Sequence, residues 1–172
     1  MVADGEGNGA AVATGAGYLA FSAQAEGTNI NPQTLLATDY LNHFNEIVMI
    51  LEMIPDIPEC FEEAQAWQPK SYQEHFRDSQ FRDKELAVNA FDHVPQCYRE
   101  PFDDVVNQMN KVVASALEKI GRAMEEDAGG RLRLVCSDAS KALQLMIDIA
   151  SAIIHGSTRR LDQSEIDGFL AQ

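Results

Sequence analysis

The sequence predicts an all-α protein: an antiparallel helical bundle with a long hairpin, a flexible N-terminal arm and a short C-terminal helix. Over 102–124 and 132–153, apolar residues recur at spacings of three and four, which is the period of an amphipathic helix. The connection between these two segments contains Gly129-Gly130, a stop signal typical of a tight turn between antiparallel helices. No segment alternates apolar and polar residues over a useful length, so no sheet is expected.

Residues 1–30 are expected to form a flexible arm. Six of the eleven glycines of the chain lie in this range, together with many Ala, Ser and Thr residues. Such a composition buries too little apolar surface to offset its chain entropy. Its only sizeable apolar group is Tyr18, Leu19 and Phe21, which is available to dock on the domain or on a partner.

The bundle domain is expected to span 31–156 and to begin with a helix of about six turns. Asn31 is a good N-cap, and Pro32 is well placed at the first helical position. One apolar stripe then runs to Pro55, and its members are Leu36, Tyr40, Phe44, Ile47, Leu51 and Ile54. The stripe predicts that this helix buries one face in the core.

Prolines interrupt residues 55–100, where we expect three short helices. The first covers about 58–66, the second begins at Ser71, and the third runs over about 83–93 with Asp83 as its cap. Ser71 and Glu74 have the spacing of a capping box. The aromatic residues expected to hold these pieces to the long helices are Trp67, Phe76, Phe81 and Phe91.

Residues 157–172 are predicted to form a linker followed by an amphipathic docking helix. Asp162 and Glu165 have the spacing of a second capping box, and Leu161 and Ile166 lie where a hydrophobic staple would form. The apolar face of this helix consists of Ile166, Phe169 and Leu170. A helix this short is marginal on its own, so the face requires a host surface.

Charge and composition exclude several classes of function. The net charge is −14, and no Lys or Arg occurs before Lys70, which argues against nucleic-acid or anionic-membrane partners. No apolar run is long enough to span a bilayer, and the three cysteines are an odd set without a CxxC pair, so we expect a cytoplasmic protein with reduced thiols. Without a P-loop, a dinucleotide fingerprint or a Gly-x-Ser-x-Gly elbow, no cofactor is expected. A homodimer through the outer faces of the hairpin stays open.

His43 is the histidine with the most suggestive neighbours, because Asp39 and Glu46 share its side of the predicted helix. These three residues are a candidate metal site with nitrogen and oxygen ligands, although the chain has no Glu-x-x-His or His-x-x-x-His pair. The run from His43 to Glu46 also resembles the start of a sensor-kinase dimerisation helix, although no acid follows the histidine directly. The simpler interpretation is a histidine on a helix face, whose proton affinity the two acids raise modestly.

The C-terminal helix carries a family resemblance. Its Gln163, Glu165, Ile166 and Asp167, with the closing pair Phe169 and Leu170, resemble the short acidic peptides of flagellar switch proteins and chemotaxis phosphatases. Those peptides bind a phosphorylated response regulator. The resemblance implies that the apolar residues, with Leu161, anchor the helix in a groove while the acids meet basic residues of the regulator.

A second segment, 102–109, is similar to the Phe-x-Asp-x-x-x-Gln stretch of chemotaxis phosphatases of the CheZ type. It contains Asp104 and Gln108 four residues apart, on the side of the helix opposite the apolar residues. The resemblance implies that Gln108 orients a water for attack on the regulator's aspartyl phosphate and that Asp104 helps to position the regulator. Most of the chain has no visible match to that family, and a further long helix separates this segment from the C-terminal helix.

The sequence therefore favours a cytoplasmic regulatory protein that binds a phosphorylated response regulator and promotes its dephosphorylation. Two alternatives remain open at this stage. One is a non-enzymatic helical scaffold that uses the hairpin face or the N-terminal arm as its contact surface. The other is a metal-binding bundle that uses Asp39, His43 and Glu46.

Overall fold

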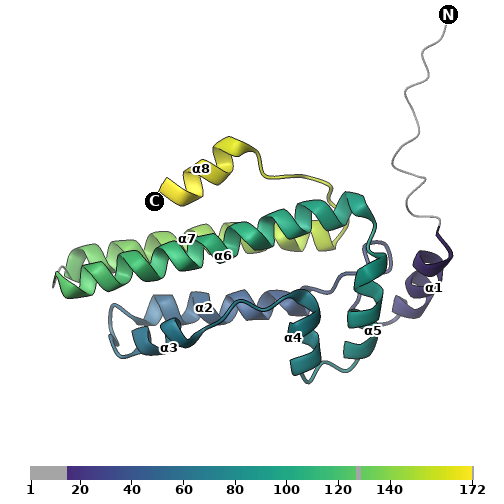
Figure 1. Cartoon of the computed structure of the whole chain (residues 1–172), viewed down its shortest axis with the longest axis horizontal. Helices are drawn as coiled ribbons and strands as arrows, with labels where there is room; N and C mark the ends of the chain where they lie inside the picture. Colours follow the sequence, from purple (N-terminus) through teal and green to yellow (C-terminus); the bar gives the residue numbers. More distant parts are fainter. Residues whose placement is uncertain (1–14, 127–128, 172) are drawn as a thin grey trace, which may run out of the picture.

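The computed structural model describes residues 15–126 and 129–171, apart from the side chains of Phe169 and Leu170, and confirms the all-α prediction (Figure 1). Over these residues the backbone forms helices and loops with a single isolated bridge, between Ile30 and Ala37, and no strand. None of the helices in this part of the chain is both long and apolar enough to cross a membrane.

The longest elements are α6 (Gln96–Glu125) and α7 (Gly129–Ile154), which pack along each other as the predicted antiparallel hairpin (Figure 1). Their apolar faces are buried, as their periodicity predicts. The fully or nearly fully buried side chains on α6 and α7 include Phe102, Val105, Met109, Ile120, Leu143, Met146 and Ile153. Gly156 has a φ of 108°, the left-handed conformation that commonly follows the last turn of a helix.

The third long segment differs from the prediction at its start. A helix from Asn31 is wrong: the chain forms a turn, then the 3₁₀-helix η2 (Thr38–Leu41) and then α2 (Asn42–Met53), which packs on α7. The Asn31 side chain does accept backbone N–H groups, from Gln33 at 2.8 Å and Thr34 at 3.1 Å, but this caps only one turn. Leu35 then adopts a φ of 61°, which is left-handed and ends any helix. All six residues of the predicted apolar stripe are nevertheless buried.

Short helices form between α2 and α6, as predicted. They are α3 (Cys60–Ala66), α4 (Tyr72–Asp78), α5 (Lys84–Ala90) and the 3₁₀-helix η3 (Phe91–His93). The capping box of Ser71 and Glu74 is present, with both reciprocal hydrogen bonds. Asp83 precedes α5 but makes no side-chain capping bond, because its backbone is not in the extended conformation that a cap requires.

A cluster of aromatic rings joins the short helices to the long ones. The ring of Tyr40 lies within 6 Å of the rings of Phe44, Tyr72, His75 and Phe102, measured between centroids. Its hydroxyl donates to the Lys70 carbonyl at 2.8 Å. The four aromatic residues predicted to hold the short helices all contribute to the core, Phe76 and Phe91 as buried and Trp67 and Phe81 as half-buried rings.

Part of the predicted N-terminal arm forms a helix. Residues 1–14 lie outside the described part of the chain, but α1 (Ala16–Ala25) is helical, so the expectation of a flexible arm to residue 30 is wrong from Ala16 onward. The alanine-rich sequence of α1 favours a helix. Contacts with other parts of the chain then stabilise this helix. Gly17 lies so close to the His93 ring that a Cβ would come within 2.5 Å of it. The hydroxyl of Tyr18 donates to the Gln33 carbonyl at 2.9 Å.

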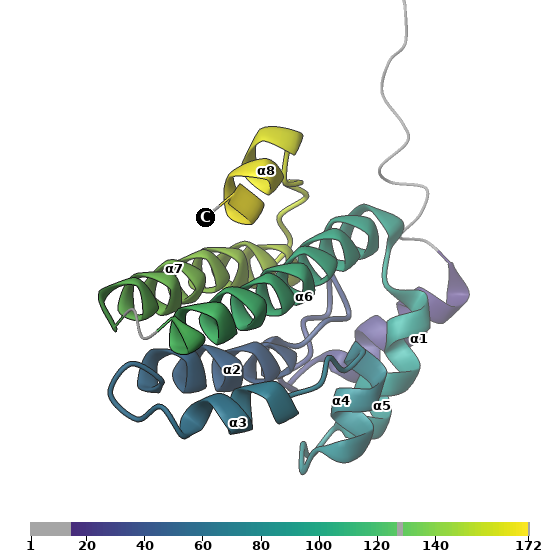
Figure 2. The ribbon, with the colours of Figure 1, turned by 60° about the vertical axis from the view of Figure 1, so that its left-hand side comes forward.

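The elements form two layers and an outlying helix. Figures 1 and 2 show the α6–α7 hairpin between α2 and α3 on one side and α8 (Gln163–Ala171) on the other. Helices α1, α4 and α5 cluster near the end of the hairpin where α6 begins. Because α8 rests on the outer side of the hairpin, it lies next to the helix that carries Asp104 and Gln108.

Phe102 provides a test of the packing. We expect Phe102→Ala to lower the free energy of unfolding by about 3–5 kcal/mol, because the ring is 1% exposed and its removal leaves a cavity against Tyr40 and Tyr72. Urea denaturation measures the change. The control is Leu145→Ala on α7, where the side chain is 52% exposed and the effect should stay below about 1 kcal/mol. Equal effects of the two substitutions would contradict the described core.

Candidate functional site

Asp104 and Gln108 lie one turn apart on the side of α6 that faces away from the core. Phe102, Val105 and Met109 take the buried side, as their spacing predicts. The Asp104 side chain is exposed, and Gln108 is half-buried. The structure thus places the two residues as neighbours on one face, in a rigid helix of 30 residues.

The side-chain oxygen of Gln108 is buried and accepts no hydrogen bond from the described residues. A buried acceptor without a donor destabilises a protein by about 1–3 kcal/mol, so such groups are rare in folded structures. The side-chain oxygen of Asn110, two residues further along α6, is in the same state, so this feature does not distinguish Gln108. Sequence reasoning identified Gln108 by its spacing from Asp104, but it gave no sign of the unsatisfied oxygen.

Helix α8 begins with the predicted capping box. The Asp162 carboxylate accepts the Glu165 N–H at 2.8 Å, and the Glu165 carboxylate accepts the Asp162 N–H at 2.9 Å. Arg159 in the preceding linker forms an ion pair with Glu165. These contacts give a helix of only nine residues a defined start.

Two contacts place α8 along α6. In the linker, Arg160 forms an ion pair with Glu100 in the first part of α6. At the other end of α8, Ala171 lines a groove with Val112 and Ser115 of α6. Asp104 and Gln108 lie between these two points in the sequence of α6, and α8 lies on the outer side of the hairpin (Figure 2).

The predicted docking residues of α8 have different environments. Leu161 is half-buried and packs against the core, while Glu165 and Ile166 are half-buried. Gln163 is exposed, and its amide donates to Asp167 at 2.8 Å. The side chains of Phe169 and Leu170, which were expected to close the apolar face, lie outside the described part of the structure.

The groove at the end of α8 has an apolar floor. It has a volume of about 300 Å³ and lies between α6 and α7, with Val112, Ala116, Val135, Ala139 and Ala142 in its lining. Leu134, at 60% exposed, stands at its edge, and Arg131 and Asp138 contribute charge. Sequence analysis assigned Val112 and Val135 to the buried faces of the hairpin and did not anticipate this groove.

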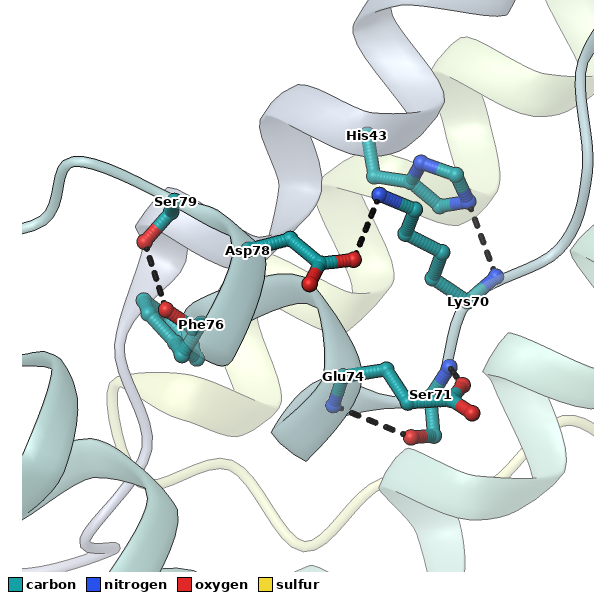
Figure 3. Close-up of polar contacts among 7 residues, drawn as sticks. All are labelled: His43, Lys70, Ser71, Glu74, Phe76, Asp78 and Ser79. Carbon is teal, nitrogen blue, oxygen red and sulfur yellow. Dashed lines mark hydrogen bonds and ion pairs between the residues drawn. The ribbon is translucent and has the colours of Figure 1, made fainter.

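His43 differs from the prediction in both exposure and proton affinity. Its side chain is 6% exposed, stacks on the Trp67 ring at a centroid distance of 4.5 Å, and lies near Lys70 and His75 (Figure 3). Burial is the main cause that lowers the pKa of His43 to about 4, and the nearby His75 and Lys70 contribute to the same shift. The expected modest rise from Asp39 and Glu46 is therefore wrong, because loss of water around the imidazolium outweighs two acids at the helix surface.

The hydrogen bond of His43 also bears on its two alternative roles, as a metal ligand and as a phosphoryl acceptor. Its Nε2 accepts the Lys70 backbone N–H at 3.1 Å, so the neutral ring carries its proton on Nδ1 (Figure 3). Nε2 is thus engaged, and it cannot bind a metal or accept a phosphoryl group while this hydrogen bond is made. In the part of the chain that the structure describes, no three His, Cys, Asp or Glu side chains are grouped to hold a metal ion, including Asp39, His43 and Glu46.

A pocket of about 550 Å³ opens beside His43, and the sequence did not indicate it. Trp67, Lys70, His75 and Asp78 contribute to its lining, and Lys70 forms an ion pair with Asp78 at 3.0 Å. The pKa of His75 is lowered mainly by burial. The charged side chains of the pocket are Glu46, Lys70 and Asp78, and two of the three neutralise each other in the Lys70–Asp78 ion pair. We therefore regard the face of α6 beside α8 as the stronger candidate site.

Comparison with known proteins returned no match, since no family model, curated protein or solved structure is similar to this chain.

The low pKa of His43 predicts a pH dependence of stability. An unfolded histidine, with a pKa of 6.5, binds a proton more readily than this one, with a pKa of about 4. Its stabilising contribution is thus complete above pH 6.5 and is lost as the pH falls toward 4. We expect a loss on the order of 1 kcal/mol by pH 5, measured by urea denaturation across this range. The slope should be smaller in His43→Asn, whereas exposed His155→Asn should leave it unchanged.

Proposed function

We propose that this protein binds the receiver domain of a phosphorylated response regulator through α8 and promotes its dephosphorylation through the outer face of α6. The observation that carries the proposal is the packing of α8 against α6, the helix that carries Asp104 and Gln108. The two segments that resemble regulator-binding proteins are separated by more than fifty residues of sequence, yet the helices that contain them contact each other. A docking element and a water-positioning residue must be close in this way for one receiver domain to meet both.

The construction of α8 supports a docking role. It is a capped, acidic, nine-residue helix at the end of a linker, and its Ile166 is only half-buried. The Arg160–Glu100 ion pair that tethers it is about half exposed at both side chains, and such pairs contribute about 0–1 kcal/mol. A helix held this weakly exchanges its own host surface for a partner's groove at small cost.

The proposed chemistry needs only one positioned water. The Gln108 amide oxygen accepts a hydrogen bond from this water, whose oxygen attacks the phosphorus in line with the aspartyl oxygen of the regulator. The P–O bond to the aspartate breaks, inorganic phosphate leaves, and the regulator recovers its carboxylate. The proton of the attacking water goes to the departing phosphate. Asp104, fully exposed one turn away, orients the receiver domain rather than the water.

A non-enzymatic scaffold is the second candidate, and the exposed leucines of α7 favour it. Leu134, at the edge of the groove between α6 and α7, is 60% exposed, and Leu145, further along α7, is 52% exposed. A scaffold of this type contacts its partner through the hairpin and does not need α8 or Gln108. The two experiments below separate the candidates.

Truncation after Arg160 should abolish binding to a receiver domain held in its phosphorylated form by beryllofluoride, as measured by fluorescence anisotropy. The reason is that the truncation removes every proposed anchor from Leu161 to Leu170. In the full chain, Ile166→Glu should weaken the same binding about ten-fold or more, because it places a charge on the anchoring face. Leu19→Glu, on exposed α1, is the control and should bind normally. Undiminished binding by the truncated chain would favour the scaffold.

Gln108→Ala should slow release of phosphate from the phosphorylated regulator by about 100-fold while leaving the affinity within about two-fold. This split follows because the amide contacts the attacking water and not the docking groove. The control is Asn107→Ala, the adjacent exposed amide that lies on another face of α6. If Gln108→Ala leaves the rate unchanged, the catalytic part of the proposal fails while the binding part stands.

A further inference from the structure

The exposed face of α2 carries an apolar stripe on the opposite side of the hairpin from α8 (Figures 1 and 2). Its members are Met49, Met53 and Ile57, which are 61%, 44% and 47% exposed. Met49 and Met53 are one turn apart on the helix. The Ile57 N–H donates to the Met53 carbonyl at 2.8 Å, so one more helical turn carries the stripe to Ile57. We call these three residues the α2 stripe.

The surroundings of the α2 stripe are strongly acidic. Glu46 and Glu52 each lie three residues from Met49, and Asp56 lies three residues from Met53, which places them at the edges of the stripe. The exposed acids of α2, the following turn and the adjacent α3 are Glu46, Glu52, Asp56, Glu59, Glu62 and Glu63. The facing α7 supplies Arg133, which pairs with Asp56 at 2.6 Å, and Lys141. Acids thus outnumber bases around the stripe six to two.

Two of these acids are held in place beside the stripe. The Glu52 carboxylate accepts hydrogen bonds from Ser140 at 2.5 Å and from Gln144 at 3.1 Å. The Arg133 ion pair likewise holds Asp56, and it lowers the pKa of that carboxyl. The edge of the stripe toward α7 therefore has its two acids opposite two bases, Arg133 and Lys141, whereas Glu46 and the acids of α3 face solvent.

We propose that the α2 stripe is the docking surface for a basic amphipathic helix of another protein. Methionine side chains are flexible and polarisable, so an exposed pair of them adapts to apolar residues of different shape. A partner helix with apolar residues at spacings of three and four covers the stripe, and Lys or Arg on one flank meets Glu46 and the acids of α3. This surface is independent of the proposed regulator binding, because it lies across the hairpin from α8 and Gln108.

Charge argues against a second copy of this chain as the occupant. A symmetric pairing through the α2 stripe brings two sets of six acids together, and like charges at close range suppress association. The negative charge around the stripe also argues against nucleic acid as its occupant, because the nucleic-acid backbone is negative as well. An apolar stripe beside the acids Glu46, Glu59, Glu62 and Glu63 matches a ligand that is apolar along one line and positive next to it.

Methyl groups of methionine give a direct test on the full chain. The protein has six methionines, and Met109 and Met146 are fully buried, which makes them internal references. With carbon-13 methyl-labelled methionine, a synthetic Lys–Leu peptide with leucines at spacings of three and four is titrated into the protein. We expect the Met49 and Met53 signals to move with the peptide while those of Met109 and Met146 stay in place. Raising the salt from about 0.05 M to about 0.5 M should weaken the effect.

Matched variants and peptides separate the proposal from simple charge attraction. Met49→Gln with Met53→Gln keeps length, charge and helix propensity but removes apolar surface, and should weaken affinity about ten-fold or more. Leu145→Gln, at a similarly exposed site on α7, should have no effect. A peptide of the same composition with scrambled order should bind much more weakly.

Three outcomes would overturn the proposal. They are equal binding of the scrambled peptide, unchanged binding by the double variant, and stationary Met49 and Met53 signals. A sedimentation experiment that finds a dimer dispersed by the double variant would assign the stripe to a second copy instead.

Discussion

The fold depends on the burial of one ring, that of Tyr40. It contacts Phe44 on α2, Tyr72 on α4 and Phe102 on α6, so three segments distant in sequence share its surface. Burial raises the pKa of Tyr40, which keeps the hydroxyl protonated as the donor to the Lys70 carbonyl. That carbonyl lies one residue before the cap of α4. The position of the short helices, and with it the environment of His43, follows from how this ring is packed.

Local patterns predicted the elements whose shape depends on local physics. The hairpin follows from apolar periodicity, and both capping boxes follow from the spacing of a hydroxyl or carboxyl with a glutamate. The start of α2 was wrong because Leu35 takes a left-handed conformation, although its side chain is fully buried in the core. Helix α1 was missed because a weakly apolar segment is ordered by contacts with Gln33 and His93, which lie outside its own sequence.

The same distinction between local patterns and tertiary contacts applies to the candidate site. The spacing of Asp104 and Gln108, and the acidic face of α8, are visible in the sequence. Their adjacency is not, since it depends on the course of the linker and on the Arg160–Glu100 pair. For His43, neighbours in sequence suggested a higher proton affinity, whereas tertiary burial lowered its pKa to about 4. Desolvation is a property of the assembled core, and no window of sequence around the histidine contains it.

The Thr34 hydroxyl, which is completely buried, donates to the Ile154 carbonyl at 2.6 Å across 120 residues of chain. During synthesis this contact stays unmade until the end of α7 has left the ribosome, so the turn before α2 waits for almost the entire polypeptide. Nascent chains stalled before α7 would expose the face of α2 that packs on α7 in the folded protein. Such intermediates are natural clients for chaperones, and high contact order of this kind slows the final closure of the core.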